Sequence, residues 1–165
     1  METKRSRPAI VRQPGEGDRR WFFGGGVHTW KATEEETNGA FLLVEVEMVL
    51  NKVTPMHTHP DSDETLYILS GEILMNMDGV EHQVAAGGIT IAPRGVPHAF
   101  KVLAEGTRVL CLHTPGGAQA FYMGASEPIG PGEPGTGIVD FDRIRESGRL
   151  NGGIELVGPP PFPEV

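Results

Sequence analysis

Between residues 41 and 113 the chain repeatedly interrupts a short apolar segment with a turn, and this spacing limits the fold to a small group of all-β architectures. Within 41–50, apolar and acidic residues alternate, as in a strand with one buried face. The Asp-Gly pair at 78–79 is the strongest hairpin signal in the chain. The Gly-Gly pair at 87–88 and the Pro-Arg-Gly segment at 93–95 mark further turns. We therefore expect a meander of at least six short strands that forms a sandwich or barrel.

The expected strands lie between these turns and a few shorter breaks. Gly71 is expected to make a close turn or a strong bend between two of them. The turn at 104–106 is expected to join the last two as a pair. The strands are predicted over 41–50, 66–70, 72–77, 80–84, 89–92, 98–103 and 108–113.

Helix is nearly absent from the expected structure. One helix is predicted over 140–150, with Asp140 as its N-cap. Residues 124–137 are rich in Gly and Pro and are expected to form an extended connector, and 154–157 is a candidate edge strand. The chain is thus expected to have three parts: an N-terminal arm (1–35), a barrel (36–123), and a connector with helix and tail (124–165).

The N-terminal arm is expected to contain strand and an aromatic cluster. We expect these side chains to pack in the core or at the interface of a homodimer, with aromatic substrate stacking as the less favoured alternative. The cluster comprises Trp21, Phe22, Phe23 and Trp30.

Composition excludes several classes of partner. The formal net charge of −8 argues against binding a phosphate backbone, so no nucleic-acid partner is expected, and the basic start of the chain is expected to be a short solvated tail. No apolar run approaches the roughly 20 residues that span a bilayer, and no signal peptide is recognisable at the N-terminus. Cys111 is the only cysteine, which excludes an internal disulfide. A cytoplasmic protein without membrane association is therefore expected.

Three histidines and one glutamate are candidate metal ligands. His57 and His59 are two residues apart, so on an extended segment both side chains point to the same face. Glu64 follows closely and can supply an oxygen ligand, and His98 comes after a Gly/Pro turn at the start of a later strand. Imidazole and carboxylate ligands suit divalent transition metals. Four such ligands leave coordination positions open, as in catalytic rather than structural sites.

These residues lie in a pattern that resembles the two motifs of the cupin superfamily. The first motif is matched by the sequence His57-x-His59-x4-Glu64-x6-Gly71, and the second by Gly87-x5-Pro93-x-Gly95-x2-His98. The fifteen residues between the motifs equal the short linker of bacterial single-domain cupins. Two framework positions depart from the pattern, because Asn51 stands where the first motif has Gly and Val102 where the second has Asn.

The resemblance implies an antiparallel β-barrel of the jelly-roll type, with a short C-terminal helix and extended arms. It implies one divalent ion held by His57, His59, Glu64 and His98 in the mouth of an apolar cavity. The ion would be nickel, cobalt, iron or manganese, and zinc could occupy the site in the purified protein. His113 is expected to be a satisfied core histidine and Cys111 a small buried hydrophobe. Candidate pocket walls on the barrel strands are Tyr67, Met75 and Phe100.

A second resemblance narrows the reaction. The Thr-Pro-Gly-Gly segment at 114–117, followed by Phe121, is similar to the segment after the barrel in quercetin-dioxygenase-like single-domain cupins. The lead-in at 37–41 and the closing segment at 153–160 are also similar. This likeness implies a small aromatic or enolisable substrate, such as a flavonol, and dioxygen as co-substrate. Glu64 would then serve both as ligand and as catalytic base.

Two other functions stay open on the sequence. The same ligands could serve a non-oxidative isomerase, cyclase or decarboxylase, which would polarise a carbonyl without consuming dioxygen. The barrel could instead be a small-ligand-binding module without catalysis.

Overall fold

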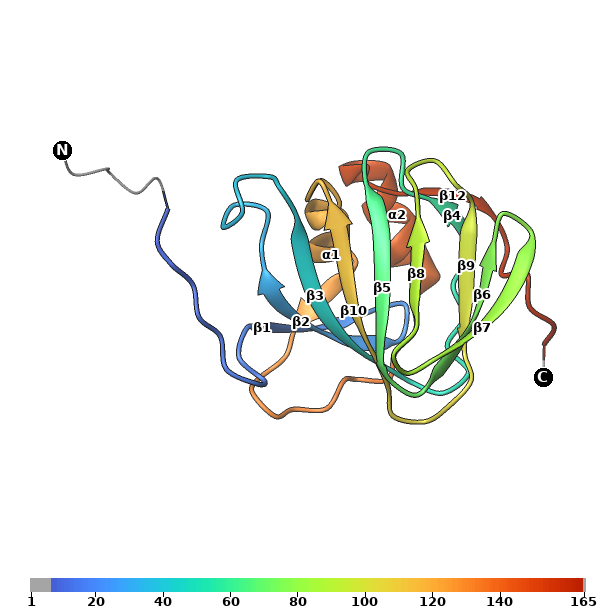
Figure 1. Cartoon of the computed structure of the whole chain (residues 1–165), viewed down its shortest axis with the longest axis horizontal. Coiled ribbons are helices and arrows are strands. Elements are labelled where there is room, and N and C mark those ends of the chain that lie inside the picture. Colours follow the sequence, from blue (N-terminus) through green and yellow to red (C-terminus); the bar gives the residue numbers. More distant parts are fainter. Residues whose placement is uncertain (1–6, 165) are drawn as a thin grey trace.

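The computed structural model describes residues 7–164, so the basic start at 1–6 lies outside the described residues. Its strands form two antiparallel sheets that together make a jelly-roll-type barrel (Figure 1). The larger sheet has the order β11-β1-β2-β3-β10-β5-β8 and the smaller sheet has the order β12-β4-β9-β6-β7. The larger sheet comprises β11 (Ser126–Pro128), β1 (Asp18–Phe22), β2 (Gly26–Ala32), β3 (Leu42–Met48), β10 (Thr107–Thr114), β5 (Asp63–Ser70) and β8 (Ile89–Ala92). The smaller sheet comprises β12 (Glu155–Gly158), β4 (Met56–Thr58), β9 (His98–Val102), β6 (Glu72–Met77) and β7 (Val80–Ala85).

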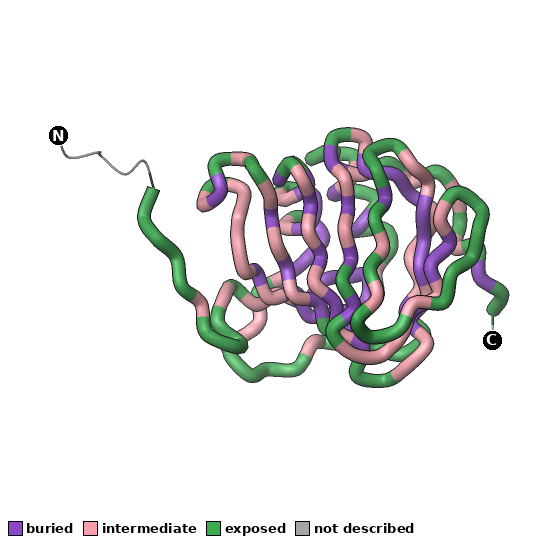
Figure 2. Tube along the Cα trace, in the orientation of Figure 1, coloured by how far each residue is buried: buried purple, intermediate pink, exposed green. Residues whose placement is uncertain are grey.

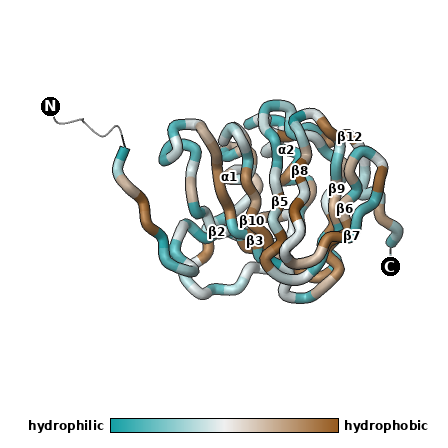
Figure 3. Tube along the Cα trace, in the orientation of Figure 1, coloured by the Kyte–Doolittle hydropathy of each residue, from teal (hydrophilic) through white to brown (hydrophobic). Residues whose placement is uncertain are grey.

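Alternation along β3 shows how the sequence builds the core. Leu42, Val44 and Val46 are buried, whereas Glu45 and Glu47 point outward from the same strand. Successive side chains of a strand point to opposite faces, so this alternation turns one face of the larger sheet inward. Figure 2 shows the same change between buried and exposed positions along several strands, and Figure 3 shows apolar segments concentrated on the strands. The core therefore lies between the two sheets.

The predicted hairpin at 78–79 is confirmed. It joins β6 to β7, with Met77 paired to Val80 across the turn. Asp78 has a φ of 51° and Gly79 a φ of 85°, so both central residues adopt the positive φ angles of a type I′ turn. This turn matches the right-handed twist of the flanking strands, which explains the choice of residues.

Gly71 is the point where the chain crosses from one sheet to the other. It separates β5 in the larger sheet from β6 in the smaller one, and its φ is 77°. A Cβ atom at this position would collide with Thr107. The close packing and the left-handed backbone both require glycine. The strong bend expected at Gly71 is therefore a change of sheet.

The expected pairing of the strands around 104–106 is wrong. β9 lies between β4 and β6 in the smaller sheet, and β10 lies between β3 and β5 in the larger one. This connection also carries the chain from one sheet to the other. Strands that follow each other in the sequence often pair, but they need not. Here β10 pairs with β3 and β5, which come from distant parts of the chain, and this pairing places β10 in the larger sheet.

Two helices are present among the described residues, one more than expected. The predicted helix is α2 (Phe141–Asn151), and the Asp140 side chain caps it by accepting hydrogen bonds from the backbone N–H groups of Asp142 and Arg143. The unexpected helix is α1 (Gln119–Gly124), a short helix without a side-chain cap. It forms because it buries Phe121 and Tyr122 in the core, and Ser147 of α2 donates a hydrogen bond to its backbone. No helix within 7–164 is long and apolar enough to cross a membrane.

The aromatic cluster of the N-terminal arm belongs to the core. Its four side chains come from β1, β2 and the turn between them, and all are buried within the single chain: Trp21, Phe22, Phe23 and Trp30. The arm therefore forms part of the larger sheet through β1 and β2. Core packing accounts for these side chains, as expected.

Candidate metal centre

The structure brings the four candidate ligands together between the two sheets. His57 lies on β4 and pairs directly with His98 on the neighbouring β9, while Glu64 reaches across from β5 in the other sheet. His59 follows the end of β4. All four side chains are buried, and their donor atoms lie within 4.8 Å of one another. The cluster thus depends on the closure of the barrel, because no single sheet supplies the whole set.

Hydrogen bonds to backbone carbonyls orient the three imidazoles. The Nδ1 atom of His57 lies 2.8 Å from the carbonyl oxygen of Pro55, and that of His98 lies 2.9 Å from the carbonyl of Val96. The Nδ1 atom of His59 lies 2.8 Å from the carbonyl of Gly153. A carbonyl can only accept, so each Nδ1 carries the proton and donates it. In the neutral ring each Nε2 then keeps a free lone pair, as metal-binding histidines do.

Two of these Nε2 atoms are left without a hydrogen-bond partner. The Nε2 atoms of His59 and His98 lie 3.0 and 3.3 Å from oxygens of Glu64, yet neither contact has the geometry of a hydrogen bond. Buried polar atoms are rarely unsatisfied, and leaving one so costs about 1–3 kcal/mol. A cation among these lone pairs and the carboxylate would satisfy all of them. The buried cluster therefore suits a divalent metal ion.

Burial and neighbouring charges set the protonation of the cluster. Burial lowers the pKa of His57 to about 3, with smaller contributions from His98 and His59, so its ring is neutral at ordinary pH. Burial alone would raise the pKa of Glu64, but the neighbouring histidines His59, His113 and His98 outweigh it and bring the pKa well below its usual range. The carboxylate is therefore ionised. Burial would lower the pKa of His98, but the hydrogen bond and the charge of Glu64 outweigh it and raise that pKa. An anionic oxygen ligand beside imidazoles that give up their proton to a bound cation suits a divalent transition metal.

A second group of side chains holds Glu64 in place. His113 on β10 is fully buried, with Nδ1 2.9 Å from Ser62 Oγ and Nε2 2.9 Å from the Tyr122 hydroxyl. Tyr122 donates a hydrogen bond of 3.3 Å to Glu64 Oε2. Since its single proton goes to Glu64, the Tyr122 hydroxyl accepts from Nε2–H of His113, and Nδ1 accepts from Ser62. His113 therefore donates to Tyr122, which in turn donates to Glu64, and both nitrogens of His113 are satisfied.

Sequence reasoning missed these supporting contacts. Ser62 and Tyr122 are ordinary residues in their local sequence, and no spacing rule connects either of them to Glu64. The carbonyl of Gly153, which orients His59, comes from the segment before β12. That segment reaches the site because β12 pairs with β4, with Leu156 opposite His57.

An apolar cavity of about 70 Å³ lies beside the cluster, and His57 and Glu64 form part of its wall. Of the expected pocket residues, Phe100 lines this cavity, and Met75 is buried opposite Phe100 without lining it. Tyr67 does not belong to the wall, because its side chain is 42% exposed on the outer face of β5. The parity of the strand explains this placement, since Tyr67 is an odd number of residues from the inward-facing Glu64.

Replacing His98 with Ala is expected to weaken metal affinity by about 100-fold or more, because one of four ligands is lost and its neighbours cannot replace it. The barrel should stay folded, since the strand pairing of β9 involves the backbone. Mass spectrometry measures the metal content of the variant, and circular dichroism shows whether the barrel stays folded. His82→Ala, on the exposed face of β7, is the matched control. Equal metal content in the His98 and His82 variants would remove His98 from the ligand set.

Comparisons with known proteins agree with this geometry. Residues 44–114 match the cupin domain family, a segment that contains all four candidate ligands. Quercetin 2,3-dioxygenase of Bacillus subtilis (strain 168) is 27% identical over 125 residues, which cover 76% of this chain and 36% of that protein. The chain thus spans about a third of the length of this curated relative.

Solved structures show the same fold at low sequence identity. The structure of KdgF from Halomonas sp. has a TM-score of 0.59 at 19% identity and covers 66% of this chain and 94% of that one. A predicted oxalate decarboxylase from Thermotoga maritima has a TM-score of 0.57 at 20% identity and covers 65% of this chain and 99% of that one. By its domain match over residues 44–114, its jelly-roll barrel and these relatives, the chain is similar to cupin proteins, and it resembles quercetin 2,3-dioxygenase over 76% of its length.

Proposed function

We propose that this protein is a metal-dependent enzyme that acts on a small aromatic or enolisable molecule as a dioxygenase of the quercetinase type. The observation that carries the proposal is the set of three imidazoles, each with Nδ1 bonded to a backbone carbonyl, whose donor atoms and that of the buried Glu64 carboxylate lie within 4.8 Å of one another. The similarity to quercetin 2,3-dioxygenase of Bacillus subtilis supports the choice of reaction.

The proposed ligands of the ion are His57, His59, Glu64 and His98. A bound divalent ion would supply Lewis acidity and a template for the oxygen atoms of the substrate and of dioxygen. The residues around it would orient the substrate, and the apolar wall of the cavity would exclude water from the reaction.

Glu64 is the proposed catalytic base. Its low pKa keeps it ionised but also makes it a weak base. It is therefore suited to accept a proton only from an acidic group, such as the hydroxyl of an enol or of a phenol conjugated to a carbonyl. Tyr122 and His113 hold the accepting oxygen in place through their hydrogen bonds.

The size of the cavity favours a second candidate. Pockets for drug-sized ligands enclose roughly 300–1,000 Å³, and a cavity of about 70 Å³ is much smaller. A flavonol would enter only if lining side chains moved, whereas a smaller molecule requires less movement. A non-oxidative isomerase, cyclase or decarboxylase with a small substrate is therefore the alternative. A ligand-binding module without catalysis is less favoured, because the ligand set leaves room for substrate at the metal.

Oxygen uptake tests the proposal. Protein is loaded separately with nickel, cobalt, iron, manganese and zinc, and uptake is recorded with quercetin and with smaller enolisable aromatics. We expect oxygen uptake only when both the metal and the organic substrate are present. His57→Ala should abolish this uptake, and His82→Ala should retain it. Absence of uptake in fully loaded protein with every substrate would exclude the dioxygenase and favour the non-oxidative alternative.

A further inference from the structure

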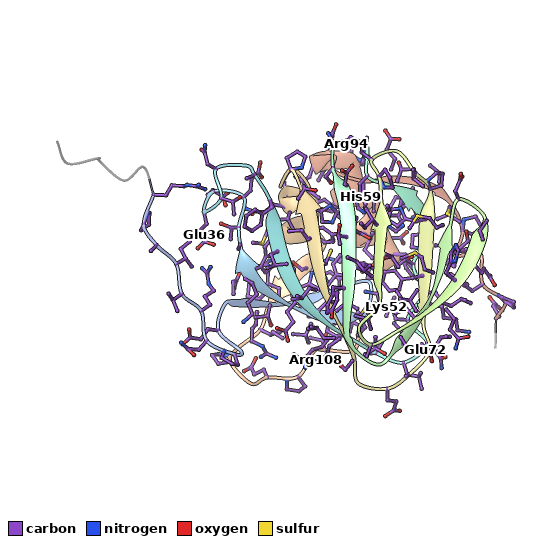
Figure 4. The ribbon with its side chains drawn as sticks, in the orientation of Figure 1. Glu36, Lys52, His59, Glu72, Arg94 and Arg108 are labelled. Atoms are coloured by element: carbon purple, nitrogen blue, oxygen red, sulfur yellow. The ribbon has the colours of Figure 1, made fainter. Side chains whose placement is uncertain are left out.

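Lys52 is a buried lysine inside the barrel that the proposed reaction does not use. Its side chain is 7% exposed and lines the same cavity as His57 and Glu64. Its ammonium lies 5.2 Å from the ring centre of Phe22 and 5.6 Å from that of Phe100. In Figure 4, Lys52 and His59 lie toward different ends of the barrel interior. Lys52 therefore provides positive charge to the cavity away from the histidine cluster.

The ammonium of Lys52 has no polar partner in the part of the chain that the structure describes. No hydrogen bond or ion pair is made by Nζ within 7–164, and its neighbours include the two aromatic rings. Lys31, by comparison, donates a hydrogen bond of 2.7 Å to the carbonyl of Glu16. A buried charge is costly unless it is paired. Cation–π contacts offset only part of that cost.

A purely structural role would need only the aliphatic stem of Lys52, which a leucine or methionine could replace. Burial lowers the pKa of Lys52 to about 8, so the group still carries its charge at neutral pH. The rest of the cavity wall is mainly apolar, so its polar groups are few and stand out. One of them, the Nδ1 atom of His28, is buried without a hydrogen-bond partner.

The two charged groups of the cavity have opposite signs. Glu64, beside the histidines, is an acidic side chain and repels an anion unless a metal ion is bound there. Lys52 attracts one. A molecule that spans the cavity would meet a metal-binding cluster at one end and a partly desolvated ammonium at the other. Charge-assisted hydrogen bonds in such an environment are about twice as strong as neutral ones.

We infer that Lys52 binds a carboxylate of the substrate, so that the substrate class is a small aromatic or enolisable carboxylate. The inference rests on the proposed function only in placing the substrate in this cavity. It also agrees with the small volume of the cavity, which favours a molecule smaller than a flavonol. Lys52 is then a specificity-determining residue that contacts the substrate away from the metal-binding cluster.

Calorimetric binding of benzoate and of benzamide to the metal-loaded, full-length protein tests this inference. The two probes have similar shapes and differ in charge. We expect wild-type protein to bind benzoate at least tenfold more tightly than benzamide. Lys52→Met and Lys52→Gln should each lose that preference by about tenfold or more and leave benzamide binding within twofold. Lys52→Arg should retain the preference for benzoate. Lys101→Met on β9, the matched control for loss of a lysine, should retain it as well.

Two results would overturn the inference. One is an absence of preference for benzoate in the wild-type protein. The other is a preference that survives in both neutral variants but disappears in His98→Ala, because the carboxylate would then bind at the metal. Binding is measured without turnover, so this test is independent of oxygen uptake. A protein that consumes no oxygen but prefers benzoate through Lys52 would refute the dioxygenase and keep the inference.

Discussion

Replacement of Glu64 by Gln is expected to lower turnover by about 10²–10⁴-fold, the range that a positioned general base contributes. The amide keeps the shape of the side chain but cannot take up a proton. It also removes the negative charge that balances a divalent ion among three neutral imidazoles, so metal content should fall as well. We expect turnover per bound metal to fall more than metal content does. Steady-state turnover and metal content of the same samples measure both losses.

Glu72→Gln is the matched control for the Glu64 variant. Glu72 lies on β6 and accepts a hydrogen bond from Gln83, away from the histidine cluster (Figure 4). We expect its replacement to change neither metal content nor turnover by more than about twofold, since surface substitutions of this kind have small effects. If turnover in Glu64→Gln fell only in proportion to metal content, Glu64 would be a ligand and not a base.

Replacement of Lys52 by Met is expected to stabilise the protein at neutral pH by as much as about 3 kcal/mol. Burial lowers the pKa of Lys52 from 10.5 to about 8, and each pKa unit corresponds to about 1.4 kcal/mol. Because the folded state disfavours the charged form, wild-type protein carries this penalty in full below pH 8. The penalty decreases as pH rises from 8 to 10.5 and is absent above that range, where the lysine is neutral in both states.

Denaturant unfolding at several pH values measures this effect as the difference between wild type and Lys52→Met. We expect the difference to be largest near pH 7 and to approach zero near pH 10.5. Lys101→Met, on a less buried side chain of β9, should show a small difference without this pH dependence. Parallel stability profiles for wild type and Lys52→Met would mean that the Lys52 charge is not desolvated in the folded protein.

Much of the fold was predictable because its signals are local. The alternation along 41–50 sets which face of β3 is buried, and the Asp-Gly pair sets the turn between β6 and β7. Asp140 was identifiable as a helix cap because its side chain bonds to backbone groups two and three residues further on. The spacing of the candidate ligands also follows from local geometry, since His57 and His59 share one face of an extended segment.

Other features depend on contacts between distant parts of the chain. Helix α1 has no cap and is too short to be stable alone, so its apolar burial against the core decides its formation. Tyr122 reaches Glu64, and Gly153 reaches His59, only because the helices and β12 pack against the barrel. The sequence separations are 58 and 94 residues, and no local pattern encodes contacts of that range.

The sequence by itself thus determined most of the barrel strands, the hairpin and the candidate metal ligands, since periodicity, turn chemistry and ligand type act over a few residues, whereas the short strands β4 and β11 were not predicted. Tertiary structure alone decided that β9 and β10 belong to different sheets and that Tyr67 faces solvent. It also decided that Lys52 is enclosed between Phe22 and Phe100, beside the cavity. Sheet assignment, burial and the pKa of an enclosed charge depend on which distant segments pack together, and that is settled by the free energy of the whole barrel.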